Sequence, residues 1–210
     1  MIMLENIQPF HANGVICCRP LSAQIGAGEN VRVEGANGSG KSTLLRVLSG
    51  LHRRYYGFYR LDGDNGADLS AGDIRRRGCV YLSQVSFLFN DLRLSEFRRL
   101  TDAVVSLDRQ PLLEEATAGI SRNQLLRHLS GGQRQFVAVF AILALKASFY
   151  MLDEPFRHLD KSRRQRLKEV FVDYFNAPGR SLVLVDHQRV LDDALPFKHV
   201  LRVEKEINKC

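Results

Sequence analysis

A glycine-rich stretch near the start of the chain carries its most specific chemistry. Residues 35–42 read GANGSGKS, which fits the phosphate-binding pattern G-x-x-x-x-G-K-[ST]. Glycines allow the backbone to curl so that successive N–H groups point toward one anion. Lys41 would reach the β- and γ-phosphates of a nucleotide, and the hydroxyl of Ser42 would bind Mg²⁺. We therefore predict a nucleotide site on this loop.

The residues on either side of the loop support this prediction. An apolar run over residues 31–34 enters the loop as a strand, and residues 42–48 leave it as a helix. The N-terminal end of that helix adds positive charge where the phosphates would lie. The predicted nucleotide contacts are Gly35, Ala36, Asn37, Gly38, Ser39, Gly40, Lys41, Ser42 and Thr43.

Other polar side chains follow short apolar runs that we interpret as buried strands of a parallel sheet. These side chains are Gln84, Asp153, Glu154 and His187. Asp153 ends its strand, where it is placed to hold Mg²⁺ together with Ser42 and the amide oxygen of Gln84. Glu154 points the other way and can orient and deprotonate an attacking water. This arrangement predicts hydrolysis of a nucleotide phosphate.

The composition describes an ordinary globular chain. Its 210 residues suffice for one domain with a hydrophobic core, and 45% of them are hydrophobic and 25% charged. The longest apolar run, residues 136–145, is too short to cross a bilayer, and we see no signal peptide. The four cysteines show no C-x-x-C spacing, so we expect unpaired thiols in a reducing compartment.

The chain is basic, with a formal net charge of +7. The basic residues gather at positions 52–54, 75–77 and 163–166. We interpret these clusters as solvated faces. Contact with nucleic acid or with an anionic membrane surface is the alternative.

The predicted elements form an α/β fold with a P-loop core and a mostly parallel sheet. The predicted strands cover residues 1–7, 15–18, 21–25, 31–34, 58–61, 79–82, 149–152, 182–185 and 200–203. The first four form an antiparallel lead-in that ends in the strand entering the glycine-rich loop. Helices are predicted over residues 94–105 and 112–118 and around residues 167–174.

These elements suggest a single domain with three parts. We expect residues 1–84 and 148–210 to form the catalytic core, including the N-terminal antiparallel β subdomain. Residues 85–147 would form a small helical subdomain.

A further motif shows which family the chain resembles. Residues 129–133 read LSGGQ and open a predicted helix. Together with the glycine-rich loop, Gln84, the strand ending in Asp153 and Glu154, and His187, this motif makes the chain resemble an ABC ATPase. Short stretches at residues 33–38, 154–156 and 187–188 are also similar to the ATPases of bacterial cytochrome c maturation.

The resemblance implies ATP and Mg²⁺ as cofactors, with Lys41, Gln84, Glu154 and His187 taking part in hydrolysis. His187 would contact the γ-phosphate. The start of the LSGGQ helix would be a second anion site, formed by Ser130, Gly131, Gly132 and Gln133. In the family, two copies pack head to tail, so this helix end closes on the γ-phosphate held by the partner's loop.

Two further residues have roles that the resemblance implies. Asp160 matches an aspartate in the loop that links the two sites. An aromatic residue near the N-terminus stacks on adenine in this family; Phe10 is the nearest candidate and His11 the next.

The chain also departs from the family pattern. Arg157 and His158 stand where small residues are usual, which puts the usual packing across the dimer in doubt. Phe136 and Ala141 stand where the family usually has arginines. A helix that is apolar all round is buried, so we expect residues 136–145 to lie in the core.

We therefore expect the ATP-hydrolysing subunit of an ABC membrane transporter. Its expected partners are a second ABC ATPase subunit, in a homodimer, and a separate transmembrane permease, at the cytoplasmic face of the cell membrane. Residues 85–89 are apolar enough to receive a helix from that permease. We expect no nucleic acid partner. A soluble ABC ATPase acting on DNA or the ribosome is the alternative, and a P-loop kinase for small molecules is disfavoured by LSGGQ.

Overall fold

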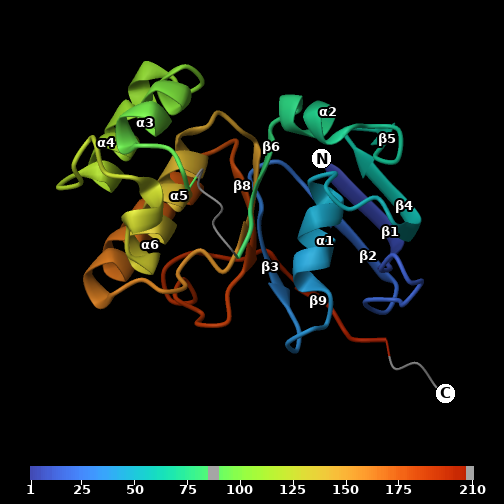
Figure 1. Cartoon of the computed structure of the whole chain (residues 1–210). Helices are drawn as coiled ribbons and strands as arrows, with labels where there is room; N and C mark the ends of the chain where they lie inside the picture. Colours follow the sequence, from blue (N-terminus) through green and yellow to red (C-terminus); the bar gives the residue numbers. More distant parts are fainter. Residues whose placement is uncertain (85–89, 207–210) are drawn as a thin grey trace.

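The computed structural model describes residues 1–84 and 90–206 and arranges their strands in two sheets (Figure 1). The strands are β1 Ile2–Pro9, β2 Leu21–Ile25, β3 Asn30–Glu34, β4 Tyr55–Leu61, β5 Asp64–Asn65, β6 Cys79–Leu82, β7 Phe149–Asp153, β8 Ser181–Val185 and β9 His199–Arg202. The helices are α1 Lys41–Leu48, α2 Ala71–Arg76, α3 Leu94–Asp102, α4 Gln110–Thr117, α5 Gly131–Ala144 and α6 Lys161–Asn176, with short 3₁₀ turns at Leu107–Arg109 and Leu126–His128.

The larger sheet is parallel, with the strand order β6-β7-β8-β3-β9. Its central strands are buried on both faces. In β7, Tyr150 and Leu152 pack on one side, while Phe149 and Met151 pack on the other. Because both faces are covered, these strands are continuously apolar rather than alternating.

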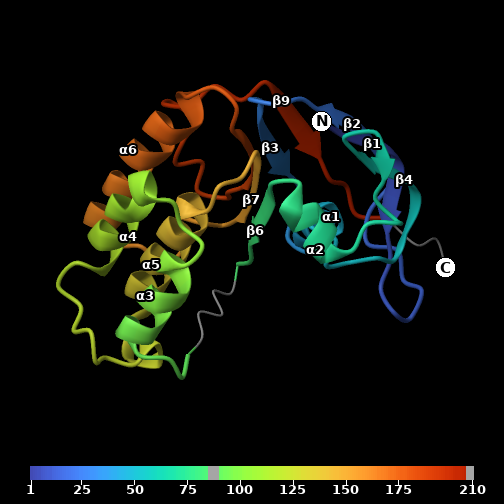
Figure 2. The same cartoon turned by 90° about the horizontal axis from the view of Figure 1, so that it is seen from above.

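Different elements cover the two faces of this sheet (Figure 2). On one side lies α1, followed by the antiparallel sheet of order β2-β1-β4-β5. On the other side lie α5 and α6, with α3 and α4 joining the same apolar cluster. Within residues 1–84 and 90–206, no helix combines the length and the hydropathy needed to span a membrane.

The predicted fold class is confirmed, but the predicted antiparallel lead-in is wrong at two places. β3 does not belong to the antiparallel sheet; it pairs in parallel with β8 and β9. The reason is burial, since Val31, Arg32 and Val33 are all at most 8% exposed, and only the parallel sheet is covered on both faces. Residues 15–18 form no strand beyond a single bridge between Phe10 and Ile16.

The helices agree with the pattern of the sequence in most respects. α5 buries the apolar run, including Phe136, Val137 and Phe140. α6 begins at Lys161, directly after the cap residue Asp160, and ends at Asn176. The helix predicted over residues 94–105 stops earlier, at Asp102. The predicted permease-docking segment, residues 85–89, lies outside the described residues.

A partly buried arginine ties the helical part to the sheet. The Nη1 atom of Arg109 donates to the Leu145 carbonyl oxygen and to the hydroxyl of Tyr174, both at 2.7 Å, and to the hydroxyl of Tyr150 at 3.2 Å. Its side chain is 13% exposed. Arg109 thus joins the C-terminal end of α5 to β7 and α6.

We expect Arg109→Met to lower the free energy of unfolding by about 2–4 kcal/mol, because it removes partly buried charge-assisted hydrogen bonds. Urea unfolding measures the effect. Arg99, an exposed arginine of α3, provides the matched control, Arg99→Met. An equal effect of the two substitutions would show that Arg109 carries no anchoring role.

Candidate nucleotide site

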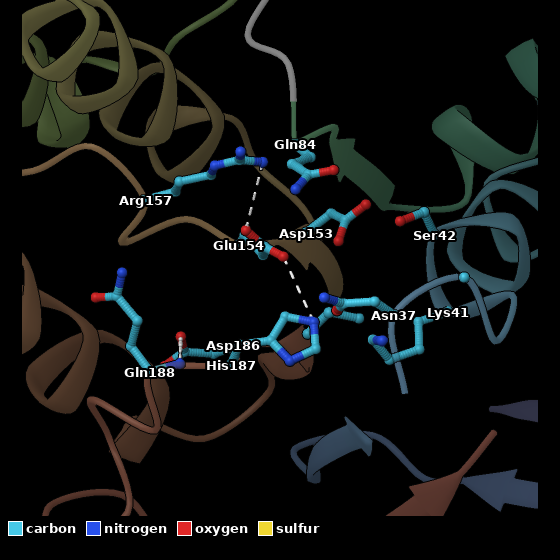
Figure 3. A pocket seen from close by; sticks show the side chains of 12 residues that line it. Asn37, Lys41, Ser42, Gln84, Asp153, Glu154, Arg157, Asp186, His187 and Gln188 are labelled. Atoms are coloured by element: carbon cyan, nitrogen blue, oxygen red, sulfur yellow. Dashed lines mark hydrogen bonds and ion pairs between the residues drawn. The ribbon is translucent and has the colours of Figure 1, made fainter. Parts of the chain in front are cut away.

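The ends of four neighbouring strands meet at one edge of the parallel sheet. Asp153 at the end of β7 is in register with Val185 at the end of β8, and β3 lies on the far side of β8. Ligands bind outside the carboxyl ends of strands in open α/β sheets. A cavity of about 620 Å³ opens at this edge. Its lining includes Lys41, Ser42, Gln84, Asp153, Glu154 and His187 (Figure 3).

The glycine-rich loop wraps around the amine of Lys41. Its Nζ atom donates to the carbonyl oxygens of Gly35 and Ala36, both at 2.9 Å, and the residue is only 6% exposed. Burial lowers the pKa of Lys41, and the charges of Asp153 and Glu154 oppose that shift. The ammonium group of Lys41 has lost most of its water and contacts carbonyl oxygens instead. It is therefore suited to bind a phosphate.

The start of α1 adds backbone N–H groups beside this loop. Gly40 precedes the helix with φ +98°, and no side chain caps the helix end. The first N–H groups of a helix have no intrahelical partners, so those of α1 remain available to an anion. A Cβ atom at Gly40 would also lie 3.2 Å from Cβ of Cys17. Its φ angle therefore favours glycine, and its packing against Cys17 is tight.

The residues beside this loop fit a magnesium ion. Asp153 is 2% exposed, and its Oδ2 atom has no hydrogen-bond partner among the described residues. Burial raises the pKa of Asp153, whereas a hydrogen bond from Ser42 lowers it. Mg²⁺ is usually held by one or two carboxylates together with substrate phosphates. The unpartnered oxygen of Asp153, beside Ser42 and Gln84 in the cavity, matches that donor set.

Glu154 is held by the backbone at the junction of β7 and β8. Its N–H donates to the Val185 carbonyl oxygen at 2.8 Å, and its φ is +51°. The carboxylate has a basic side chain on each side. His187 Nε2 lies 3.6 Å from Oε1, and Arg157 Nη1 lies 3.7 Å from Oε2. Figure 3 shows both contacts as dashed lines reaching the two oxygens separately.

Arg157 departs from the family pattern, but the sequence does not predict that it lies in the cavity. The structure puts Arg157 in the lining, together with Asp186 and Gln188. Asp186 accepts hydrogen bonds from the amides of Gln188 and Val190. These bonds shape the loop that carries His187. An acidic residue directly after a buried strand and before a turn was the signal for this role.

The LSGGQ segment forms a well-capped helix start away from this cavity. The Ser130 hydroxyl accepts from the Gln133 amide at 3.1 Å, and the Gln133 side chain accepts from the Ser130 amide at 2.9 Å. This capping box leaves Ser130 and Gly131 exposed. Neither these residues nor Gly132 is part of the cavity lining. In one chain, the exposed start of α5 therefore lies apart from the cavity that contains Lys41.

Two close contacts connect the LSGGQ helix with the loop after Glu154. Gln135, 3% exposed, donates from Nε2 to the Pro155 carbonyl oxygen at 3.2 Å. A Cβ atom at Gly132 would lie 2.7 Å from the His158 carbonyl oxygen. Gln135 was missed in the sequence, although a polar residue at the start of an apolar helix was a usable signal.

Of the predicted loop contacts, Asn37, Gly38, Lys41 and Ser42 line the cavity. The other predicted contacts, among them Asp160 and Phe10, lie outside its lining, as do Gly35, Ala36, Ser39, Gly40 and Thr43. Asp160 caps α6, accepting from the Arg163 amide at 2.8 Å. Phe10 stacks on Tyr56 with ring centroids 4.8 Å apart. The preceding residue, Pro9, accepts from the amide of Cys17. Since Cys17 packs on Gly40, the chain segment with Phe10 passes close to the glycine-rich loop.

The fold and the site define a P-loop nucleoside triphosphatase. A family model described as ABC transporter matches residues 18–157. The chain therefore belongs to the ABC transporter family. It is an ATP-binding, ATP-hydrolysing subunit of that family, with ATP and Mg²⁺ as cofactors.

Similar proteins agree with this assignment. The cytochrome c biogenesis ATP-binding export protein of Shewanella frigidimarina is 29% identical, over 90% of this chain and 92% of its own length. An aliphatic sulfonates import ATP-binding protein of Xanthomonas axonopodis is 33% identical, over 84% of this chain and 70% of its own. A dimeric ATP-binding cassette bound to ADP and phosphate shares the fold, with a TM-score of 0.81 at 24% identity over 99% of this chain and 98% of its own.

Proposed function

We propose that this subunit hydrolyses ATP at sites shared by two copies packed head to tail. The supporting observation is the separation of the two anion sites within one chain. The P-loop cavity has no contribution from Ser130 or Gly132 of the same chain. At the exposed start of α5, the Ser130 hydroxyl accepts from the Gln133 amide, which leaves the N–H groups of Gly131 and Gly132 for a phosphate. A second copy can supply that helix end, and a closed twofold arrangement pairs both sites at once.

Within each site, the residues divide the work of hydrolysis. Residues 35–43 bind the phosphates through the loop and the start of α1, and Lys41 adds a positive charge. Ser42, Gln84 and Asp153 would hold Mg²⁺, which supplies charge neutralisation for the β- and γ-phosphate oxygens. Glu154 orients the attacking water and accepts its proton. His187, which lines the same cavity beside Glu154, binds the γ-phosphate.

The partner copy completes the site. Its Ser130, Gly131, Gly132 and Gln133 bind the γ-phosphate through the start of α5. Asp160, the cap residue of α6, ends the loop that follows Glu154, and we assign it to the link between the two sites. Phe10, stacked on Tyr56, is the proposed platform for adenine, and His11 is the alternative. ATP then holds the two copies together, and its hydrolysis releases them.

The proposed assembly includes a separate permease subunit at the cytoplasmic face of the membrane. The relatives named above are called ATP-binding proteins of an export and an import system, which supports this proposal and leaves the direction of transport open. We propose residues 85–147 as the helical subdomain of a single ABC domain. Nothing in the relatives' names favours DNA or the ribosome as a partner.

Mixing two inactive variants tests the shared site. Lys41→Ala disables the P-loop, and Ser130→Glu places a negative charge against the γ-phosphate. In a head-to-tail dimer of one copy of each, both defects fall in the same site and the other site is intact. Random mixing should therefore restore about a quarter of the wild-type sites, since half of the dimers are mixed and one site in two is whole.

Nucleotide binding and ATPase activity of the mixture provide the measurement, with each variant alone as its own control. If the mixture is no more active than the variants alone, each chain works independently and the shared site is excluded.

A further inference from the structure

Arg157 also lines the cavity. The reaction described above assigns no role to its positive charge. Arg157 lies in the loop after Glu154, three residues further on, and its side chain is 41% exposed. It lines the same cavity as Lys41, Ser42 and His187. In Figure 3 its guanidinium extends over the cavity toward Glu154 and Gln84. A permanent positive charge therefore stands in the space where phosphates would bind.

The contact between Arg157 and Glu154 is easily broken. The atoms Nη1 and Oε2 are 3.7 Å apart, which is longer than a hydrogen bond. Ion pairs with this degree of exposure contribute little to stability. The side chain of Glu154 is 19% exposed, and His187 approaches its other oxygen at 3.6 Å. Glu154 therefore keeps a polar neighbour when Arg157 moves away.

Glu154 needs a free carboxylate oxygen to accept a proton from water. A terminal phosphate carries more negative charge than one carboxylate, and guanidinium binds phosphate through paired N–H groups. A nucleotide that fills the cavity would thus draw Arg157 away from Glu154. The same movement places a positive charge beside the phosphate and leaves the Glu154 carboxylate free to act as the base.

We propose that Arg157 binds the terminal phosphate of ATP in its own subunit and makes the site prefer the triphosphate to the diphosphate. This inference rests on the proposed function. ADP, which lacks the terminal phosphate, leaves Arg157 on Glu154. An arginine supplied by the same chain is known to stabilise phosphoryl-transfer transition states in other P-loop proteins.

The test compares the affinities for the non-hydrolysable analogue AMP-PNP and for ADP, both with Mg²⁺, by calorimetry. Arg157→Gln should reduce the preference for AMP-PNP about ten- to a hundred-fold, the effect of losing one charge-assisted contact. Arg157→Lys keeps the charge without the paired N–H groups, and should retain part of the preference.

Arg76→Gln is the matched control. Arg76 pairs with Asp73, also three residues apart, but it is 73% exposed and lies outside the cavity lining. This variant should leave the affinity ratio unchanged. Thermal unfolding without nucleotide, measured for every variant, accounts for any loss of folded protein.

The possible outcomes distinguish a failure of the Arg157 proposal from a failure of the proposed function. An unchanged affinity ratio in Arg157→Gln would overturn this proposal. A higher rate of ATP hydrolysis in that variant would also overturn it, since it would show that Arg157 acts as an inhibitory latch on Glu154. If the wild-type chain itself failed to bind and hydrolyse MgATP, the proposed function would fall instead.

Discussion

Glu154→Gln should reduce the rate of ATP hydrolysis by about 10²- to 10⁴-fold, the contribution of a positioned general base, while ATP binding is retained. Glutamine has the shape of glutamate but cannot accept the proton of the attacking water. The backbone hydrogen bond from residue 154 to the Val185 carbonyl oxygen does not depend on the side chain. The site should therefore keep its geometry and lose only its base.

The same substitution should trap a dimer bound to ATP. Removing the negative charge leaves Arg157 and His187 without their carboxylate partner, so both can face the phosphate. Because hydrolysis is what separates the two copies in the proposed cycle, blocking it preserves the closed state.

Light scattering after size-exclusion chromatography, with and without MgATP, measures the trapped species. Glu169→Gln is the control, since Glu169 lies on α6 with its side chain 48% exposed and pairs with Arg166 away from the cavity. A Glu154→Gln protein that stays monomeric with MgATP would contradict the shared site.

Much of the fold is readable from the sequence because burial leaves a pattern. β2 and β6 have the predicted bounds, and β7 and β8 differ from them by one residue at one end. Strands covered on both faces are continuously apolar, and the polar residue after each of them is conspicuous. Gln84, Asp153, Glu154 and His187 stand out for that reason, and the structure brings all of them to one cavity.

The sequence within and around a strand does not show which other strands it pairs with. β3 pairs with β8 and β9, about 150 residues later in the chain, and no periodicity near residue 31 contains that information. Cys17 and Cys18 form part of an apolar run that predicted a strand, but they are buried through packing, with Cys17 against Gly40 of the glycine-rich loop. Burial by a neighbouring loop and burial within a sheet leave the same local signal.

The site shows the same limit at the level of side chains. The sequence shows that Arg157 departs from the family pattern, but it does not show where the side chain lies in the fold. Its position in the cavity depends on the turn after β7, where both Glu154 and His158 adopt positive φ angles. Only the folded loop shows that the Arg157 side chain lies beside Glu154.

Lys41→Ala should weaken ATP binding by about 10²-fold or more, because it removes the contacts of one ammonium group with two phosphates. The effect should exceed that of losing an exposed lysine, since Lys41 is 6% exposed and its charge is little screened by water. Calorimetry with AMP-PNP measures the loss. The control is Lys168→Ala, which removes an amine paired with Asp193 on the distant α6 surface.

The bonds of Lys41 within the free protein suggest a second consequence of this substitution. Its amine holds the carbonyl oxygens of Gly35 and Ala36, so alanine also removes the hydrogen bonds around which the loop curls. AMP has neither a β- nor a γ-phosphate, and its affinity therefore reports on the loop rather than on the charge. A loss for AMP-PNP with AMP unaffected assigns the effect to the charge of Lys41. An equal loss for both would show that the lysine acts by holding the loop, and would contradict its assignment as a phosphate ligand.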